Sequence, residues 1–204
     1  MNALAESADK NPPQLKMRSR TGSDRQSIIK HPAYSEMEQL AFGDFAMAAL
    51  SHRADLPGWP GPCPPLVKYL FTYLFVQAEF GLMCPVSMTD SLARTLKKFG
   101  SPMLTQRYLP RLTSLDAATR LQGAMFMTEQ DAGSDIAATT ALAVPAQDHY
   151  LLYGEKWFCS NPDAGLAMVL ARIEGAPEGI KGVSLFLLPR TLEGEPPTPT
   201  EFCG

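Results

Sequence analysis

The hydrophobic pattern of the chain changes near Arg120, and this change limits its fold more than any other feature. Before it, apolar residues recur three or four positions apart, which predicts helices. After it, short apolar runs alternate with Gly, Pro, Asn and Asp, which predicts β-strands at 122–127, 137–144, 150–153, 166–173 and 183–188. Helices followed by strands indicate an α+β fold or two domains.

The helical part is divided by prolines and glycines, which predict helices at 34–48, 66–83, 86–99 and 103–112. His31-Pro32 sets the first boundary, because proline is disfavoured after a helical residue and tolerated in a first turn. The 66–83 segment is apolar on nearly every side, as is typical of a helix enclosed by others. Thr89 and Asp90 are candidate N-caps of the third helix.

The first 30 residues are polar and contain Pro12-Pro13, which predicts an arm or a loosely packed segment. We therefore expect three parts: a polar arm over 1–30, a helical domain over 31–118 and a β-domain over 119–204. Six cationic side chains in the arm outnumber its acids and could bind phosphate backbones, although a solvated segment is the simpler interpretation.

Composition excludes several classes of protein. The 204 residues are 45% hydrophobic and 19% charged, as in an ordinary globular protein, and the net charge of −3 argues against binding nucleic acid through the overall field. Four cysteines without a CxxC pair favour reduced thiols and a cytoplasmic location, and predict no metal site. Lys68, Gln77 and Glu79 interrupt the longest apolar run, so no membrane span is expected.

Two segments carry the chemical signal. In Met127-Thr-Glu-Gln-Asp-Ala-Gly-Ser-Asp135 a predicted strand runs into a loop whose glycine permits close backbone approach and whose hydroxyls and amides can face an anion. Taken alone, the segment slightly favours a hairpin loop that uses Gly and Asp for its turn geometry. In Gly154-Glu-Lys-Trp-Phe-Cys-Ser-Asn161 an aromatic pair and a hydroxyl at the end of a predicted strand could stack on a flat heterocycle, or simply pack in a core.

Together, the two segments resemble the flavin-contacting signature of the acyl-CoA dehydrogenase superfamily. The flanking segments Asn11-Pro-Pro-Gln-Leu15, His31-Pro-Ala-Tyr34 and Leu82-Met-Cys-Pro-Val-Ser-Met-Thr89 are similar to its bacterial alkylation-response branch. The resemblance implies an amino-terminal helical domain followed by a β-barrel-like middle domain, here incomplete, with the carboxy-terminal helical domain missing. It also implies FAD as cofactor, acyl-CoA as substrate and a homo-oligomer in the full-length form.

The resemblance assigns roles by position in the motifs. Thr128 would donate to the pyrimidine side of the flavin and Ser160 would face its N5 region. Phe158 would pack beside the ring, where many relatives have tryptophan. The pyrophosphate would be held by Gly133 and Ser134, and Met127 would supply backbone contacts.

No catalytic residue is assigned within the chain. The family's base is a glutamate that would lie beyond Gly204, and Glu129 is given a place in the binding loop. Ser134 lacks the flanks of a nucleophile elbow, and the three histidines form no hydrolase triad. Paired acids such as Asp131 and Asp135 are more often capping or solvated groups.

The expected function is therefore part of a flavin-dependent acyl-CoA dehydrogenase of fatty acid metabolism, truncated and inactive by itself. One alternative is a DNA-associated stress-response flavoprotein with incidental turnover. Another is an inactive module that needs a partner. If a covering domain is absent, the 66–83 helix should be left partly exposed and should promote association.

Overall fold

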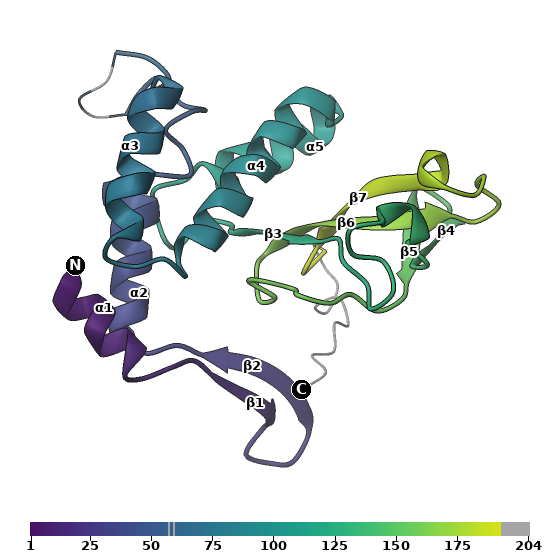
Figure 1. The fold of residues 1–204 in the computed structure, drawn as a ribbon, viewed down its shortest axis with the longest axis horizontal. Coiled ribbons are helices and arrows are strands. Elements are labelled where there is room, and N and C mark those ends of the chain that lie inside the picture. The colour runs from purple at the N-terminus through teal and green to yellow at the C-terminus, as the bar shows by residue number, and fades with distance from the viewer. Residues whose placement is uncertain (57, 59, 193–204) are drawn as a thin grey trace.

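The computed structural model describes residues 1–56, 58 and 60–192. Helices gather at one end and a sheet at the other, with a hairpin extending away from the helices (Figure 1). The helices are α1 (Asn2–Asp9), α2 (Pro32–Gln39), α3 (Pro65–Val76), α4 (Met83–Phe99) and α5 (Pro102–Leu112). The architecture is thus α+β, as predicted.

Helix boundaries follow local signals. His31 Nδ1 accepts a hydrogen bond from the Ala33 N–H at 3.2 Å and so caps α2, with Pro32 in the first turn. Gly100 ends α4. Ser101 then caps α5 by accepting from the Leu104 N–H at 3.3 Å.

The amino-terminal segment is not the loosely packed arm that was predicted. Residues 2–9 form α1, whose buried Ala8 packs in one apolar cluster with Met37 of α2. Strands β1 (Gln14–Arg18) and β2 (Asp24–Ile29) form an antiparallel hairpin. The polar composition of the segment comes largely from the hairpin, whose first strand is exposed along its length. Because of this composition, the short amphipathic helix was not predicted.

Two predicted helices are shorter than expected. The 34–48 segment is α2 followed by a π-helical turn, Leu40–Asp44. The 66–83 segment splits into α3, a turn and the start of α4. Between these two segments, residues 57 and 59 lie outside the described part of the chain.

Helix α3 is not enclosed by other helices. Phe75 is its one buried residue, whereas an apolar stripe at helical spacing is exposed: Leu66, Tyr69, Leu70, Tyr73 and Leu74, each more than half accessible. The prediction that this helix is enclosed, made from its apolar residues on nearly every side, is therefore wrong. The exposed stripe agrees with the expectation that this segment is left partly uncovered.

The sheet contains β3 (Gly123–Phe126), β4 (Leu142–Ala146), β5 (His149–Tyr153), β6 (Leu166–Ile173) and β7 (Val183–Pro189). Strand β6 is central: β3 and β4 pair with it in parallel at successive positions, and β7 pairs antiparallel on its other edge. Strand β5 pairs antiparallel with β4. Over the described residues this is an open five-stranded sheet, not a closed barrel.

Helix α4 joins the two parts. Its Leu92 and Leu96 share an apolar cluster with Leu166 and Met168 of β6. Buried Thr89 accepts a hydrogen bond from the Gly123 N–H at 2.8 Å and donates to the Pro85 carbonyl at 2.8 Å. Thr89 and Asp90 are thus interior residues of α4 and not N-caps, because the helix begins at Met83.

Asp90 is instead the centre of a buried polar group. Its carboxylate lies 2.9 Å from His52 Nε2 and contacts Lys68 of α3. Burial by itself would raise the pKa of Asp90, but the contacts from His52 and Lys68 outweigh it and lower the pKa. This group anchors α3 to α4.

Among the described residues, no helix is both long and apolar enough to cross a bilayer.

Candidate cofactor site

The two sequence motifs lie side by side in the structure. The first follows β3 and the second follows β5. The Trp157 N–H donates to the Thr128 carbonyl at 2.8 Å, and Lys156 Nζ donates to the Met127 carbonyl at 3.3 Å. Residues 128 and 157 are therefore joined backbone to backbone, and the two loops are in contact.

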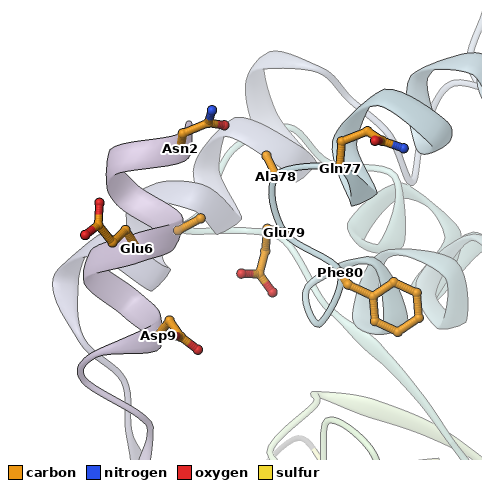
Figure 2. A pocket seen from close by; sticks show the side chains of 8 residues that line it. Asn2, Glu6, Asp9, Gln77, Ala78, Glu79 and Phe80 are labelled. Carbon is orange, nitrogen blue, oxygen red and sulfur yellow. The ribbon is translucent and has the colours of Figure 1, made fainter.

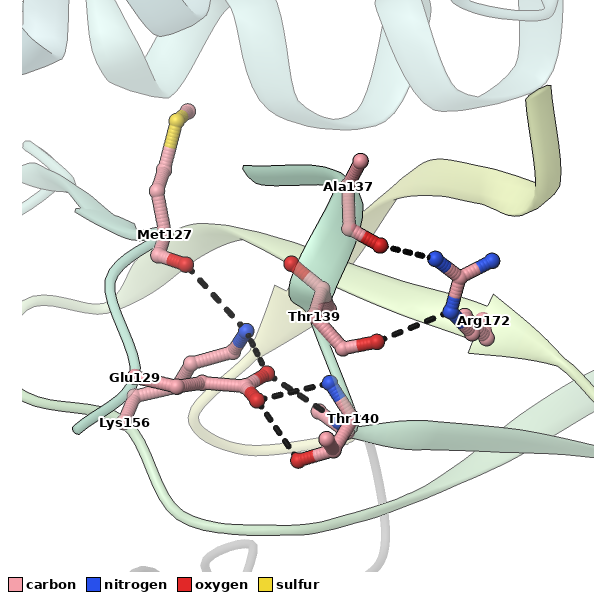
Figure 3. A network of polar contacts seen from close by, with 8 residues as sticks. Met127, Glu129, Ala137, Thr139, Thr140, Lys156 and Arg172 are labelled. Atoms are coloured by element: carbon pink, nitrogen blue, oxygen red, sulfur yellow. Dashed lines mark hydrogen bonds and ion pairs between the residues drawn. The ribbon is translucent and has the colours of Figure 1, made fainter. Parts of the chain in front are cut away.

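Glu129 is the most heavily engaged residue of the first motif. Its carboxylate, 7% exposed, accepts from Lys156 Nζ at 2.6 Å, from the Thr140 N–H and hydroxyl at 2.7 Å each, and from the Ala141 N–H at 3.0 Å (Figure 3). Burial alone would raise the pKa of Glu129, but the hydrogen bonds from Lys156, Thr140 and Ala141 lower it to about 2.

This environment argues against Glu129 as a catalytic base. A base that removes a carbon-bound proton needs a free lone pair and a pKa near the working pH. Four donors occupy the Glu129 carboxylate and keep it ionised far below neutral pH. The binding-loop position assigned from the motif agrees with this geometry.

The end of the first motif is fixed by side chains and not by strand pairing. Asp135 accepts from the Ala137 N–H at 3.0 Å, and Arg172 Nε donates to the Thr139 carbonyl at 2.8 Å. Arg172 also donates to the Ala137 carbonyl (Figure 3). Because side chains satisfy these backbone groups, residues 136–138 form a 3-10 turn and β4 begins only at Leu142, later than the predicted 137.

The predicted cofactor residues are accessible. Met127 and Thr128 are half-buried, while Gly133, Ser134, Phe158 and Ser160 are exposed. The hydroxyls of Thr128, Ser134 and Ser160 make no hydrogen bond to the described part of the chain, so each is free to donate to a ligand.

The second motif lies in a loop directly after the end of a strand, at the place predicted from the sequence. Strand β5 ends at Tyr153, and Gly154 has a φ of +143° that L side chains rarely adopt. Phe158 has a φ of +54° and its side chain is 83% exposed. The alternative of an aromatic pair packed in a core is therefore wrong for Phe158.

Gly133 fits a site where a ligand approaches the backbone closely. A Cβ built there would meet only Thr128 Cγ2, at 4.0 Å, and the residue does not have a positive φ. The fold therefore does not require glycine at this position, and the backbone here is open to close approach from outside.

The second loop is also attached to the helical part, which the sequence did not predict. Asn161 Nδ2 donates to Gln122 Oε1 at 3.1 Å, and Gln122 Nε2 donates to Glu38 Oε1 of α2 at 2.9 Å. Lys30 Nζ lies 3.1 Å from Glu38 and 3.4 Å from Asp163. These contacts span up to 133 positions, so no local pattern could have revealed them.

Two hollows of the described chain lie away from these loops. One of about 320 Å³ is formed by α1 and the turn after α3, with the carboxylates of Glu6, Asp9 and Glu79 around it (Figure 2). A smaller one of about 120 Å³ lies beside Asp90. Neither contains a predicted cofactor residue, and the loop residues Ser134, Phe158 and Ser160 are exposed at the surface.

Comparison with known families agrees with both parts of the fold. Residues 1–117 match the family described as adaptive response protein AidB, N-terminal domain, and residues 124–201 match the acyl-CoA dehydrogenase middle domain. The chain belongs to the AidB branch of the acyl-CoA dehydrogenase superfamily. The match covers the amino-terminal and middle domains only, as the motifs predicted.

Individual relatives give the same result. AidB of Escherichia coli is 28% identical over 201 residues, which are 93% of this chain and 35% of that protein. Caenorhabditis elegans ACDH-11, solved in complex with C11-CoA, has a TM-score of 0.80 and 28% identity over 94% of this chain and 33% of its own. The FAD complex of PigA has a TM-score of 0.59 and 27% identity, covering 74% of this chain and 39% of its own.

This chain thus spans between 33% and 39% of these three relatives. It lies in a flavoprotein oxidoreductase family. The C11-CoA and the FAD are bound to those relatives.

Proposed function

We propose that the chain supplies one wall of a flavin site in an acyl-CoA dehydrogenase. The observation that carries the proposal is the backbone hydrogen bond between the two motif loops, because both loops carry accessible hydroxyls and the second also carries an exposed aromatic ring. PigA in its FAD complex and ACDH-11 in its C11-CoA complex support FAD as cofactor and an acyl-CoA as substrate.

The residues present suit a flavin. Thr128 and Ser160 would donate hydrogen bonds to the polar edge of the ring system, and the exposed Phe158 ring would cover part of its face. Ser134 and the open backbone at Gly133 would receive the pyrophosphate. Bound FAD would supply the hydride acceptor for α,β-desaturation of the acyl thioester.

The chain's own groups would contribute electrostatics. Negative charge accumulates at a flavin as it is reduced, and preorganised donors stabilise such charge most effectively where water is excluded. Thr128 and Ser160 are the residues assigned to this task. A covering element is needed to exclude water, because the surface is open in this chain.

We propose further that the chain alone does not dehydrogenate acyl-CoA. Glu129, which directly follows Thr128, is committed to four donors and is therefore not available for proton removal. An assay with acyl-CoA and an artificial electron acceptor should give no rate above free FAD. Substrate-dependent dye reduction that is abolished by a substitution within this chain would contradict the proposal.

Two partners have less support. A homo-oligomer is expected for the longer relatives. For DNA, the hairpin offers exposed Lys16 and Arg18, but Arg18 lies 3.4 Å from Asp24, and charge alone does not carry a DNA-binding function.

A cytoplasmic location is also part of the proposal, because the cysteines at 63, 84 and 159 are free thiols.

A further inference from the structure

We propose that Lys156 and Glu129 are a positioning pair that sets the separation and orientation of the two cofactor loops. This inference rests on the proposed flavin site and names residues that shape it without touching the ligand. The hydrogen bonds of the pair, its burial and the residues next to it in the sequence support the proposal.

The pair connects three segments of chain. Lys156 Nζ contacts Glu129 Oε1 at 2.6 Å and the Met127 carbonyl at 3.3 Å, which joins the second loop to the first. Through Thr140 and Ala141, Glu129 extends the connection to the start of β4. Figure 3 shows the Lys156 and Glu129 side chains directed toward each other between these segments.

The pair is buried, which makes its geometry well defined. The side chains of Lys156 and Glu129 are 9% and 7% exposed. A buried ion pair gains little net stability over apolar residues of the same volume, because desolvation offsets the attraction. Directional hydrogen bonds are what such a pair adds, and here they fix the relative position of two loops.

The residues beside the pair are those assigned to the flavin. Half-buried Thr128 directly precedes the buried Glu129 in the first loop. In the other loop, Phe158 and Ser160 follow Lys156 by two and four positions. A shift of Lys156 would therefore move the donors of one loop relative to those of the other.

The second loop also needs to be held. Phe158 and Asn161 have φ values of +54° and +56°, in the left-handed region, which a bulky residue such as Phe158 rarely adopts. Asn161 is fixed on one side by hydrogen bonds to Gln122 Oε1 and the Gly123 carbonyl. Lys156 is the corresponding anchor on the other side, so the exposed Phe158 is presented from a loop fixed at both ends.

The test compares the intact chain with three variants. Lys156→Met keeps an unbranched apolar stem, and Lys156→Arg is the conservative variant. Lys97→Met, at an exposed site, is the control. FAD affinity is measured by quenching of FAD fluorescence, together with the visible absorption spectrum of the bound flavin. Hydrogen exchange of the Trp157 amide, which bonds to the Thr128 carbonyl, reports the loop junction without any ligand. Circular dichroism checks that each variant is folded.

We expect Lys156→Met to weaken FAD binding about tenfold, to alter the bound spectrum and to speed exchange at Trp157, because small displacements of positioned groups are costly. Lys156→Arg should restore most of the affinity, and Lys97→Met should behave as the unmodified chain. If Lys156→Met does not fold, Glu129→Gln should show the same changes in weaker form. A loss of stability with unchanged spectrum and unchanged affinity would mean a purely structural pair.

The outcomes separate the two proposals. If the unmodified chain binds no FAD even at millimolar concentration, the proposed flavin site fails, and the exchange at Trp157 alone decides whether the pair holds the loops together. If the chain binds FAD and Lys156→Met changes neither affinity, spectrum nor Trp157 exchange, the flavin site stands and the positioning pair is refuted.

Discussion

Replacing Glu129 by glutamine should remove a pH-dependent part of the stability. The pKa of Glu129 is lowered from 4.5 to about 2 by its donors, a difference of about 2.5 units. At about 1.36 kcal/mol per unit, the ionised carboxylate contributes on the order of 3 kcal/mol to folding. Because the folded pKa is the lower one, this contribution is fully present above about pH 4.5 and is lost as the pH falls toward 2.

The measurement is urea unfolding of the unmodified chain and of Glu129→Gln between pH 6 and pH 2.5, at low protein concentration. The difference in unfolding free energy between the two should shrink by about 2.5 kcal/mol over this interval, since most of the linkage lies above pH 2.5. Asp90, whose pKa is also lowered, is present in both proteins and cancels in the difference. Asp131→Asn, at an exposed acid of the same loop, is the matched control.

Parallel stability curves for the unmodified chain and Glu129→Gln would refute the reasoning. They would mean that the carboxylate is solvated and that Lys156 and Thr140 do not hold it in solution. A difference that grows as the pH falls would be more damaging, because it would require a raised pKa.

Three further predictions concern the contact between α4 and β3, the first motif loop and the exposed stripe of α3. Thr89→Val should cost about 1–3 kcal/mol in urea unfolding, because it leaves the buried Gly123 N–H without an acceptor, while Thr89→Ser should cost less. Gly133→Ala should leave the melting temperature unchanged and weaken FAD binding, whereas Gly182→Ala should lower the melting temperature, because its Cβ would lie 1.9 Å from a backbone oxygen. The chain should self-associate in light scattering and bind an apolar dye through the α3 stripe, and Leu74→Lys should reduce both; a monodisperse, dye-free monomer would contradict this.

The sequence predicted the order of elements well because the signals are local. Proline and glycine marked the helix ends at Pro32 and Gly100, and the strand from Leu166 to Ile173 has the predicted bounds. The α1 helix was missed because eight residues give too few turns for a clear periodicity. Thr89 was wrongly predicted to be an N-cap because threonine is common at N-caps. The sequence alone does not show that its hydroxyl instead bonds to a strand.

The two motifs of the candidate site could be predicted from the sequence, but the arrangement of their residues in space could not. Motif position identified the residues that face outward, such as Ser134 and Ser160. The residues that hold them, Glu129 and Lys156, are separated by 27 positions, and their pairing depends on how β3 and β5 meet the rest of the sheet. For α3, the apolar pattern predicted a helix enclosed by others, whereas the expectation of an exposed helix came from the resemblance, which implies a missing covering domain.

The central claim is that the two motif loops form one wall of a flavin site. Its most direct test is a titration of the purified chain with FAD, compared with Ser134→Ala and Ser160→Ala, and with Ser23→Ala in the distant hairpin as the control. We predict weak, saturable binding that each loop variant reduces and the hairpin variant does not, because the loops present only an open surface. Absence of saturable binding, equal affinity in all four proteins, or copurification with stoichiometric FAD would contradict the account.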